Sequence, residues 1–481
     1  MTEVMPFGDH AVRFAVPSSI ALRRALFLRM RALPGVLDVV LCEEVGCVVL
    51  GDATPEDVTR ALAEPLAAVH APPARHVVRV VYDGEDLPAL AATLGLRREA
   101  ILSLHCDRAY EVSMLGFLPG FAYLRGLAPE LVLPRRAPRP RVPARSVAIG
   151  AEYAGIYPVA SAGGWHLLGR ALDAPRFALG DEVTFVASAS ASASALDDVP
   201  APAVGPPPPA GPHLVITRLA GLALFVDGSR RGRMHEGMPP GGPLVRRLLA
   251  RANANAGNGP DACAIELTGM LEVEACGGTV HVADDSHAAT LREGERFTLT
   301  SGKLRARYLT IGGGIDAPII DGGRGALLPA GISRPLRRAD TVASIDPASV
   351  PPRAAPPSDR DGALALAIDL DTPIAILPGP DATPEALDRL HADDLAISTV
   401  SDRTGTRLAG AAPALPAGTR PSAPMIEGAI ELTPSGFVVL GPDHPTTGGY
   451  PVVALLRAHA RDAFFAKPLG AKVRFNLDRA E

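Results

Sequence analysis

The chain lacks the features that mark membrane proteins and nucleic-acid-binding proteins. No apolar run approaches the roughly 20 residues that a membrane-spanning helix needs, and Met1 to Val16 do not have the basic-then-apolar order of a signal peptide. Positive charge is not in excess, because 52 acidic residues against 47 lysines and arginines leave a formal net charge of −5. We therefore expect a cytoplasmic protein that binds neither membrane nor nucleic acid.

Cysteine is also scarce. The five cysteines are an odd number, and no two of them have the CxxC spacing of a zinc or redox site. A reduced protein without disulfides fits this pattern, and a structural zinc site does not. The sequence therefore predicts no bound metal.

The usual cofactor motifs are missing as well. Ser301-Gly302-Lys303-Leu304 lacks the leading glycine and the final hydroxyl residue of a phosphate-binding loop, and Gly312 to Gly314 is an isolated glycine run. No G-x-S-x-G turn is present, nor is the Ala/Val-Met-Lys-Met signal for biotin attachment. We expect that this chain alone binds no cofactor, so that any ATP or carboxybiotin reaches the reaction through a partner.

What the sequence has in abundance is glycine and proline, 48 of each, which favours short elements joined by turns. Two stretches rich in small residues or proline, 187–212 and 347–362, predict linkers. They divide the 481 residues into units that we predict as follows: a small α/β domain at 1–76, a barrel at 77–186, a first barrel of the second half at 213–346 and a second at 363–481.

Within the first units, periodicity predicts individual elements. Residues 18–33 have the spacing of a helix, 45–50 that of a strand, and Thr54-Pro55 begins a second helix. Residues 77–82 read as a strand and 86–102 as a helix. The remainder alternates short β segments with turns, so the predicted fold is mainly β, with closed or nearly closed antiparallel barrels.

Two pairs of short segments hint at a duplicated barrel. Gly155 to Val159 recurs as Gly448 to Val452, with the Gly-x-Tyr-Pro-Val pattern in both. Leu179 to Phe185 recurs as Leu469 to Phe475, with Leu-Gly-x-x-Val-x-Phe in both. The two pairs occur in the same order, as internal repeats would.

Residues 115–170 combine glycines, aromatics and arginines. Arg145, Ser146, Tyr157 and Trp165 can supply an anion clamp and an aromatic wall. The alternative is a glycine- and proline-rich barrel rim with a solvated basic loop.

Residues 398–410 together with 427–451 form the second dense region, referred to below as 398–451. Asp402, Arg403, Asp443 and Thr447 can polarise a carbonyl and orient a small polar substrate beside a Gly-Gly turn. The alternative is an ordinary hairpin turn cornered by an aspartate. We expect the two regions to form one shared site. On that view Asp402→Asn and Arg403→Ala reduce turnover with little change in melting temperature, whereas a large loss of stability supports the turn-only role.

The motifs together resemble a known family. Residues 5–186 resemble the B subunit of 5-oxoprolinase, also described as a kinase inhibitor and as allophanate hydrolase subunit 1, through PFGDHAVRF, GFLPGFAYL and GGWHLLGR. Residues 213–478 resemble the C subunit of the same enzyme through SDRTGTRL, EGAIEL and TTGGYP, with a more divergent stretch at 213–346. The resemblance implies several barrels similar to cyclophilin, after a small α/β domain.

The resemblance also implies function. It indicates a component of an ATP-linked amide-processing enzyme, which either opens 5-oxoproline to glutamate with a partner like the A subunit of 5-oxoprolinase or transfers a carboxyl group with a biotin carboxylase-like partner. A repurposed enzyme for another small carbonyl compound and a kinase-inhibitor-like regulator stay open as alternatives. Beyond the catalytic candidates Asp402, Arg403, Asp443 and Thr447, the predicted substrate-binding residues are His105, Pro119, Arg145, Ser146, Tyr157, Trp165, Arg407, Gly448, Gly449 and Tyr450.

Overall fold

The computed structural model describes residues 3–67, 72–189, 211–346 and 368–478, apart from five single positions at 174, 229, 393, 417 and 419. Most of the first predicted linker and all of the second therefore lie outside the described residues. Strands outnumber helices, which confirms the predicted mainly β fold class with a small N-terminal α/β unit. In the described part of the chain, no helix is long and apolar enough to cross a membrane.

The N-terminal unit is a four-stranded antiparallel sheet with two helices on one face. The predicted helix start at Thr54 is confirmed, because the Thr54 side chain and Asp57 form a reciprocal capping box. In spatial order the strands are β1 (Val4–Pro6), β2 (Ala11–Ala15), β4 (Val45–Leu50) and β3 (Val36–Leu41), and the helices are α1 (Ile20–Ala32) and α2 (Pro55–Ala63).

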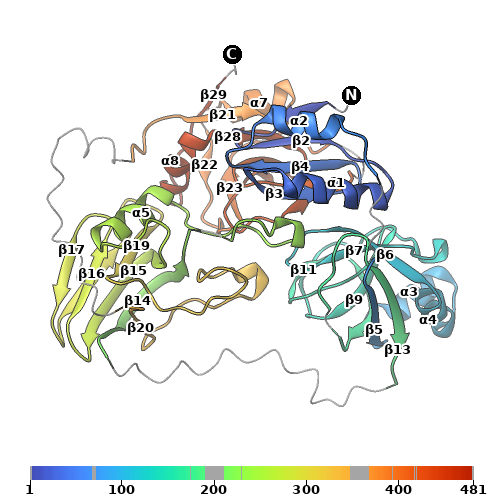
Figure 1. Cartoon of the computed structure of the whole chain (residues 1–481), viewed down its shortest axis with the longest axis horizontal. Coiled ribbons are helices and arrows are strands. Elements are labelled where there is room, and N and C mark those ends of the chain that lie inside the picture. Colours follow the sequence, from blue (N-terminus) through green and yellow to red (C-terminus); the bar gives the residue numbers. More distant parts are fainter. Residues whose placement is uncertain are drawn as a thin grey trace.

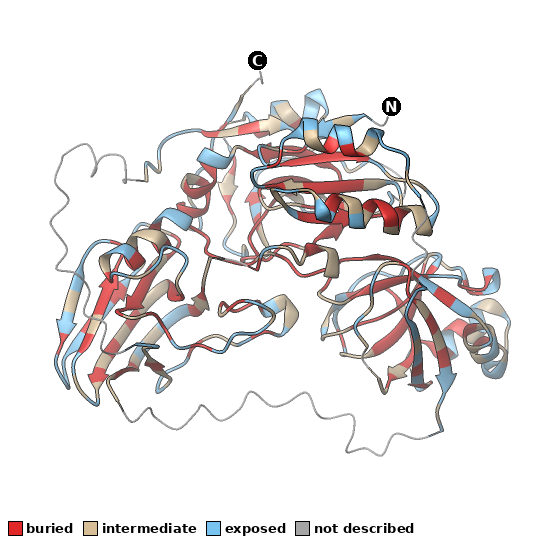
Figure 2. Cartoon of the chain, viewed as in Figure 1, coloured by how far each residue is buried: buried red, intermediate tan, exposed pale blue. Residues whose placement is uncertain are grey.

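The other face of this sheet is covered by the C-terminal end of the chain. Phe7, Ala11 and Cys47 form a buried cluster with residues such as Met425 and Leu455. Figure 1 shows the blue N-terminal sheet lying against the red and orange C-terminal strands, and Figure 2 shows β2 and β4 largely buried. The sheet is thus buried on both faces, which fixes the N-terminal unit to the distant C-terminal barrel.

The first barrel is a closed ring of seven strands in which only β5 and β13 run parallel. The predicted helix at 86–102 is two helices, because Gly95 takes a left-handed conformation (φ 64°) that ends the first one. The strands, in order round the ring, are β5 (Arg75–Val81), β12 (His166–Ala171), β9 (Ser146–Gly150), β10 (Tyr153–Ile156), β7 (Ala122–Arg125), β6 (Ala109–Leu115) and β13 (Glu182–Ala187). The helices are α3 (Leu87–Leu94), α4 (Arg98–Cys106) and the 3₁₀ turn η1 (Pro129–Leu131), and β8 (Arg139–Val142) pairs with β11 (Ser161–Gly163) outside the ring.

The middle region is a seven-stranded antiparallel sheet built round one long strand pair. Its hydrogen-bonded order has two ends, at β17 and β20, so it is a half-open sheet where the first barrel is closed. The elements are β14 (His213–Val226), β15 (Ala264–Cys276), β16 (Val280–Asp284), β17 (Ala288–Leu291), β18 (Arg296–Thr300), β19 (Arg307–Ile311), β20 (Thr341–Ala343), η3 (Met234–Glu236), α5 (Arg246–Asn255) and η4 (Leu328–Ala330).

The C-terminal barrel closes in nearly the same way as the first. Its last strand, β29, runs parallel to its first, β21, and a bridge between Ala396 and Lys472 connects the two ends of the sheet. In order the strands are β21 (Ile374–Pro378), β28 (Val452–Leu456), β25 (Ala429–Thr433), β26 (Gly436–Leu440), β23 (Gly405–Ala409), β22 (Ala396–Ile397) and β29 (Phe475–Leu477). The other elements are α7 (Pro384–Leu390), η5 (Ala458–Ala460), α8 (Arg461–Ala466) and the pair β24 (Ala423–Pro424) with β27 (Thr447–Gly448).

The two barrels have the same strand order when each is followed from its parallel first strand. The repeat of 179–185 as 469–475 falls on equivalent last strands, β13 and β29. The Tyr-Pro repeat does not fall on equivalent elements, because 155–159 begin at the end of strand β10 whereas 448–452 lead into β28. The counterpart of Gly448-Gly449-Tyr450 is Gly163-Gly164-Trp165, which leads into β12.

Candidate functional site between the two barrels

A glycine- and proline-rich segment, residues 230–243, runs between the two barrels; we call it the connecting segment. The Gly120 N–H of the first barrel donates to the Glu236 carbonyl at 2.8 Å, and the Gly241 N–H donates to the Pro442 carbonyl of the C-terminal barrel at 3.0 Å. A Cβ on Gly237 would stand 2.4 Å from the Leu118 carbonyl oxygen, so only glycine fits there. Backbone contacts on both sides therefore hold the two barrels in register.

The two barrels also touch directly, at Thr447. The Phe117 N–H donates to Thr447 Oγ1 at 3.0 Å across 330 residues of sequence. A Cβ on Gly116 would lie 2.0 Å from the same oxygen, so glycine is required for this approach. Burial raises the pKa of Tyr123, and the Ser422 and Thr447 hydroxyls, which lie beside the Tyr123 hydroxyl, partly oppose this rise. The dense regions 115–170 and 398–451 thus meet at a small cluster of hydroxyl groups, which we call the seam.

Aromatic rings fill the first barrel beside the seam. Phe121 makes edge contacts with Tyr123, Tyr157 and Trp165 at centroid distances of 5.1 to 5.3 Å. Trp165 packs so closely on Gly150 that a Cβ there would meet its ring at 2.7 Å. Tyr157 and Trp165 are both buried, at 1% and 5% exposure, and so form a packed wall behind the seam.

Arg145 and Ser146 shape the backbone of this wall. Arg145 has a left-handed conformation (φ 64°), and its N–H donates to the Tyr157 carbonyl at 2.6 Å. Ser146 is buried, and its hydroxyl donates to the Pro143 carbonyl at 2.8 Å. The structure thus brings both residues next to Tyr157. The Ser146 hydroxyl, however, forms its hydrogen bond within the local turn that begins at Pro143.

His105 lies in the core of the first barrel, on helix α4. It is fully buried, packs on Phe185 at a centroid distance of 4.5 Å, and its Nδ1 shares a 2.7 Å hydrogen bond with the Tyr82 hydroxyl. Burial lowers the pKa of His105 to about 3, so the ring is neutral. Its surroundings are core residues of this barrel and include no group of the seam.

Arg403 is the centre of a buried ion network in the C-terminal barrel. Its Nε and one terminal nitrogen donate to Asp443, each at 2.9 Å, and its other terminal nitrogen donates to Glu266 of the middle region. Glu266 also accepts from the Tyr308 hydroxyl at 2.7 Å. Burial alone lowers the pKa of Arg403, but Asp443 and Glu266 raise it above its usual value, so the guanidinium stays charged. Asp443 is 2% exposed and both its oxygens accept from Arg403, so the pair supports the loop on which Thr447 lies.

The remaining residues of the 398–451 region have separate surroundings. The Asp402 carboxylate accepts from the Thr404 and Gly405 N–H groups, at 2.8 and 2.9 Å, and so forms the aspartate-cornered turn. Arg407 is exposed and donates to Ser435. Tyr450 is 43% exposed at the rim, next to Gly448 and Gly449.

Sequence reasoning did not single out Glu431 or several buried polar atoms near the seam. Glu431 Oε1 lies 3.1 Å from where a Cβ on Gly448 would stand, and burial raises its pKa to about 7. His444 Nε2 and Thr446 Oγ1 are buried, and no described residue forms a hydrogen bond with either atom. An acidic residue inside an otherwise apolar strand, Ala429–Thr433, was the available signal for Glu431.

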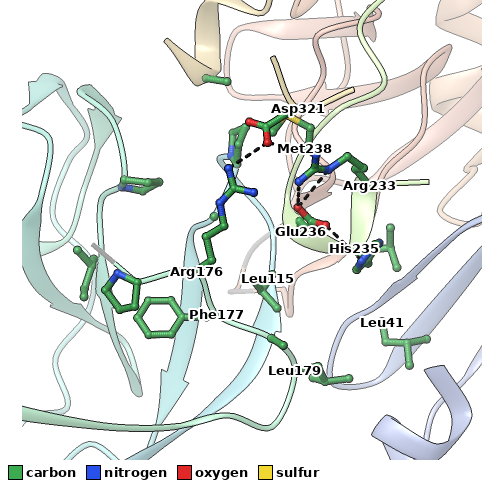
Figure 3. A pocket seen from close by; sticks show the side chains of 18 of the residues that line it. Leu41, Leu115, Arg176, Phe177, Leu179, Arg233, His235, Glu236, Met238 and Asp321 are labelled. Carbon is green, nitrogen blue, oxygen red and sulfur yellow. Dashed lines mark hydrogen bonds and ion pairs between the residues drawn. The ribbon is translucent and has the colours of Figure 1, made fainter. Parts of the chain in front are cut away.

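A cavity of about 540 Å³ opens beside the connecting segment (Figure 3). It lies where the N-terminal unit, the first barrel, the connecting segment and a loop of the middle region meet, and Pro119 is the predicted site residue in its wall. Asp321 pairs with Arg176 at 3.0 Å and with Arg233 at 3.2 Å on one side, and apolar residues line the other. Because these charges neutralise one another, the cavity offers room for a small molecule but no free charged anchor. In the described residues no group of His, Cys, Asp and Glu is arranged to hold a metal ion.

Comparison with known proteins establishes the family. A family model described as carboxyltransferase domain, subdomain C and D, matches residues 3–179, and one described as carboxyltransferase domain, subdomain A and B, matches residues 236–477. Since the second alone covers more than half of the chain, the protein belongs to the carboxyltransferase-domain family.

Individual relatives agree with this assignment. The crystal structure of TTHA0988 is similar over 99% of this chain and 100% of its own, with 30% identity and a TM-score of 0.83. The B subunit of Escherichia coli 5-oxoprolinase is 48% identical over 96 residues, which is 19% of this chain and 44% of that relative. The C subunit of Escherichia coli 5-oxoprolinase is 28% identical over 292 residues, 54% of this chain and 90% of that relative. The match thus spans less than half of the length of the B subunit. The resemblance to both kinds of 5-oxoprolinase subunit is confirmed.

Proposed function

We propose that this chain is the combined B- and C-like component of an ATP-linked enzyme that acts on a small amide or lactam. In this proposal 5-oxoproline is the substrate, and a separate protein like the A subunit of 5-oxoprolinase binds ATP and activates the carbonyl group. Relatives of both halves are named as 5-oxoprolinase subunits, which supports the reaction class.

The observation that carries the proposal is the seam. Hydroxyl groups of Tyr123, Ser422 and Thr447 come together where the B-like and C-like halves meet. Hydroxyls donate to a carbonyl oxygen and accept from an amide N–H, so such a cluster can orient both sides of a lactam. Fusing the halves in one chain keeps their effective concentration high, which matters when the reactive groups lie at their contact.

Carboxyl transfer from carboxybiotin, delivered by a biotin carboxylase-like partner, is the second candidate. It is favoured by the description of both matching family models as carboxyltransferase subdomains. The same hydroxyl cluster would then hold the amide nucleophile that accepts the carboxyl group.

The test combines the purified chain with candidate ATP-binding partners of the A type, ATP and 5-oxoproline, and measures ADP and glutamate. We expect glutamate formation that requires both proteins, and a loss of about 10²-fold in kcat for Tyr123→Phe. Arg296→Met is the control, because Arg296 is an exposed residue of the C-like half that pairs with Glu272 and Glu274 away from the seam, and this variant should retain full activity. Glutamate formation without this chain would contradict the proposal, and carboxylation of an amide by carboxybiotin would favour the second candidate.

A further inference from the structure

Arg13 is a buried cation that forms no direct ion pair within the described part of the chain. The side chain is 8% exposed, its Nε is fully buried without a hydrogen-bond partner, and the guanidinium makes no hydrogen bond or ion pair with any described residue. Its contact is with the ring of Phe7, 4.9 Å from the guanidinium carbon. A cation over an aromatic face offsets only part of the cost of burying a full charge.

The neighbours of Arg13 do not neutralise it. The one nearby carboxylate, Asp381, already accepts from Arg420 and, at 2.9 Å, from the Val452 N–H. The two nearby thiols are neutral, because burial raises the pKa of Cys47 to about 12 and that of Cys42 further still. Two arginines, Arg13 and Arg420, therefore share a single carboxylate, and the region keeps an excess positive charge.

The position of Arg13 connects it with the seam. Strand β2 directs Arg13 toward the C-terminal barrel, on the same face as Cys47, its partner in β4. Cys47 packs with Met425, and Met425 Cε lies 3.1 Å from where a Cβ on Gly448 would stand. Arg13 thus lies on the sheet face that packs against Met425, the residue that contacts the Gly448–Gly449 turn.

We propose that Arg13 forms an anion subsite beside the Gly448–Gly449 turn and binds the carboxylate of a small carboxylic acid substrate. A guanidinium matches a carboxylate with two parallel hydrogen bonds, and a bound anion supplies the missing counter-charge. The assignment of this carboxylate to the substrate rests on the proposed function. It implies that a lactam carrying a carboxylate binds, whereas the same lactam without that group lacks its anchor.

The experiment measures binding to the full chain by calorimetry and by thermal shift. Three probes are used: 5-oxoproline, pyrrolidin-2-one, which is the same ring without the carboxylate, and formate, which is a carboxylate alone. The proteins are wild type, Arg13→Met and Arg13→Gln. Arg23→Met is the matched control, because Arg23 is also buried in the N-terminal unit but donates to the Ser113 carbonyl at 2.8 Å.

We expect wild type and Arg23→Met to bind 5-oxoproline at least about 10-fold more tightly than pyrrolidin-2-one, and both Arg13 variants to lose this preference. In carboxylate-free buffer Arg13→Met should melt no lower than wild type, whereas Arg23→Met should melt lower because Ser113 loses its donor.

Two outcomes overturn the proposal: an undiminished preference for 5-oxoproline in the Arg13 variants, or a thermal shift by carboxylates that is the same in wild type and both variants. If neither lactam binds but formate raises the melting temperature of wild type and not of the Arg13 variants, the anion subsite is supported and the lactam function fails.

Discussion

Replacing Arg403 with methionine tests whether this residue acts by stabilising the loop that carries Asp443 and Thr447. Methionine keeps much of the side-chain volume but removes the charge, so Asp443 and Glu266 remain as two buried carboxylates without their shared partner. Removing one member of a buried ion pair typically costs 3–5 kcal/mol, which is about 2 to 4 decades in the folding equilibrium. Since domains of this size are stable by only about 5–15 kcal/mol, the loss is readily measured. We therefore expect Arg403→Met to lower both stability and activity.

Urea unfolding followed by circular dichroism at about pH 7 measures this loss. Arg407→Met is the stability control, because Arg407 is an exposed residue of β23, the strand that follows Arg403. Its guanidinium donates to Ser435 at 2.8 Å, a contact worth less than about 1 kcal/mol. The triple change Arg403→Met, Asp443→Asn, Glu266→Gln removes all three charges and should recover part of the loss. An Arg403→Met protein as stable as Arg407→Met but inactive would refute this reasoning and restore the direct catalytic role predicted from the sequence.

Three further changes follow from burial and close packing. Burial raises the pKa of Glu431 to about 7, so the neutral Glu431 stabilises the fold fully below about pH 4.5, and this stabilisation is lost as pH rises through 7. The free energy of unfolding should therefore fall by up to ~3 kcal/mol over this range. Glu431→Gln should make this fall smaller in unfolding experiments repeated across pH. Burial lowers the pKa of His105 to about 3, so the neutral ring stabilises the fold fully above about pH 6.5, and this stabilisation is lost as pH falls toward 3. His105→Phe should therefore reduce the loss of unfolding free energy at acid pH by up to ~5 kcal/mol. Acid unfolding that is the same in wild type and His105→Phe would contradict this. Gly116→Ala should lower the free energy of unfolding by about 1–3 kcal/mol, because the added Cβ would clash with Thr447. A melting temperature equal to that of wild type would show that Thr447 can move away without cost.

Local patterns in the sequence predicted local structure well. The apolar run 45–50 coincides with β4, and Thr54-Pro55 begins α2 with the capping box that those residue types favour. The region expected as one helix at 86–102 contains two, because the first helix ends at Gly95 in a left-handed conformation. The sequence alone does not show whether a glycine inside a helical pattern adopts this conformation. Strand order could not be predicted, because registers between strands far apart in sequence depend on tertiary packing.

The candidate site also depends on tertiary contacts that the sequence alone does not predict. The sequence identified Thr447 and the 116–119 turn, and the structure brings them into contact. It gave no means of telling that Arg403 and Asp443 bind each other, because an ion pair and a catalytic pair use the same residue types. Arg13 was not distinguished from other arginines either, because the missing partner is a property of the assembled interface and not of the strand on which it lies.

The two barrels have one strand order but differ in the aromatic residue that follows their equivalent double-glycine turns. In the first barrel the Gly163-Gly164 turn leads to Trp165, which is 5% exposed and fills the space left by Gly150. In the C-terminal barrel the equivalent Gly448-Gly449 turn leads to Tyr450, which is 43% exposed and leaves the inner side of the turn to Glu431. An aromatic ring packed inward stabilises a barrel, whereas the outward Tyr450 ring does not fill the space beside Glu431, which is 6% exposed. Under the proposed function, the first barrel is therefore the packed wall behind Tyr123, and the C-terminal barrel supplies Thr447 and the turn near which Arg13 lies.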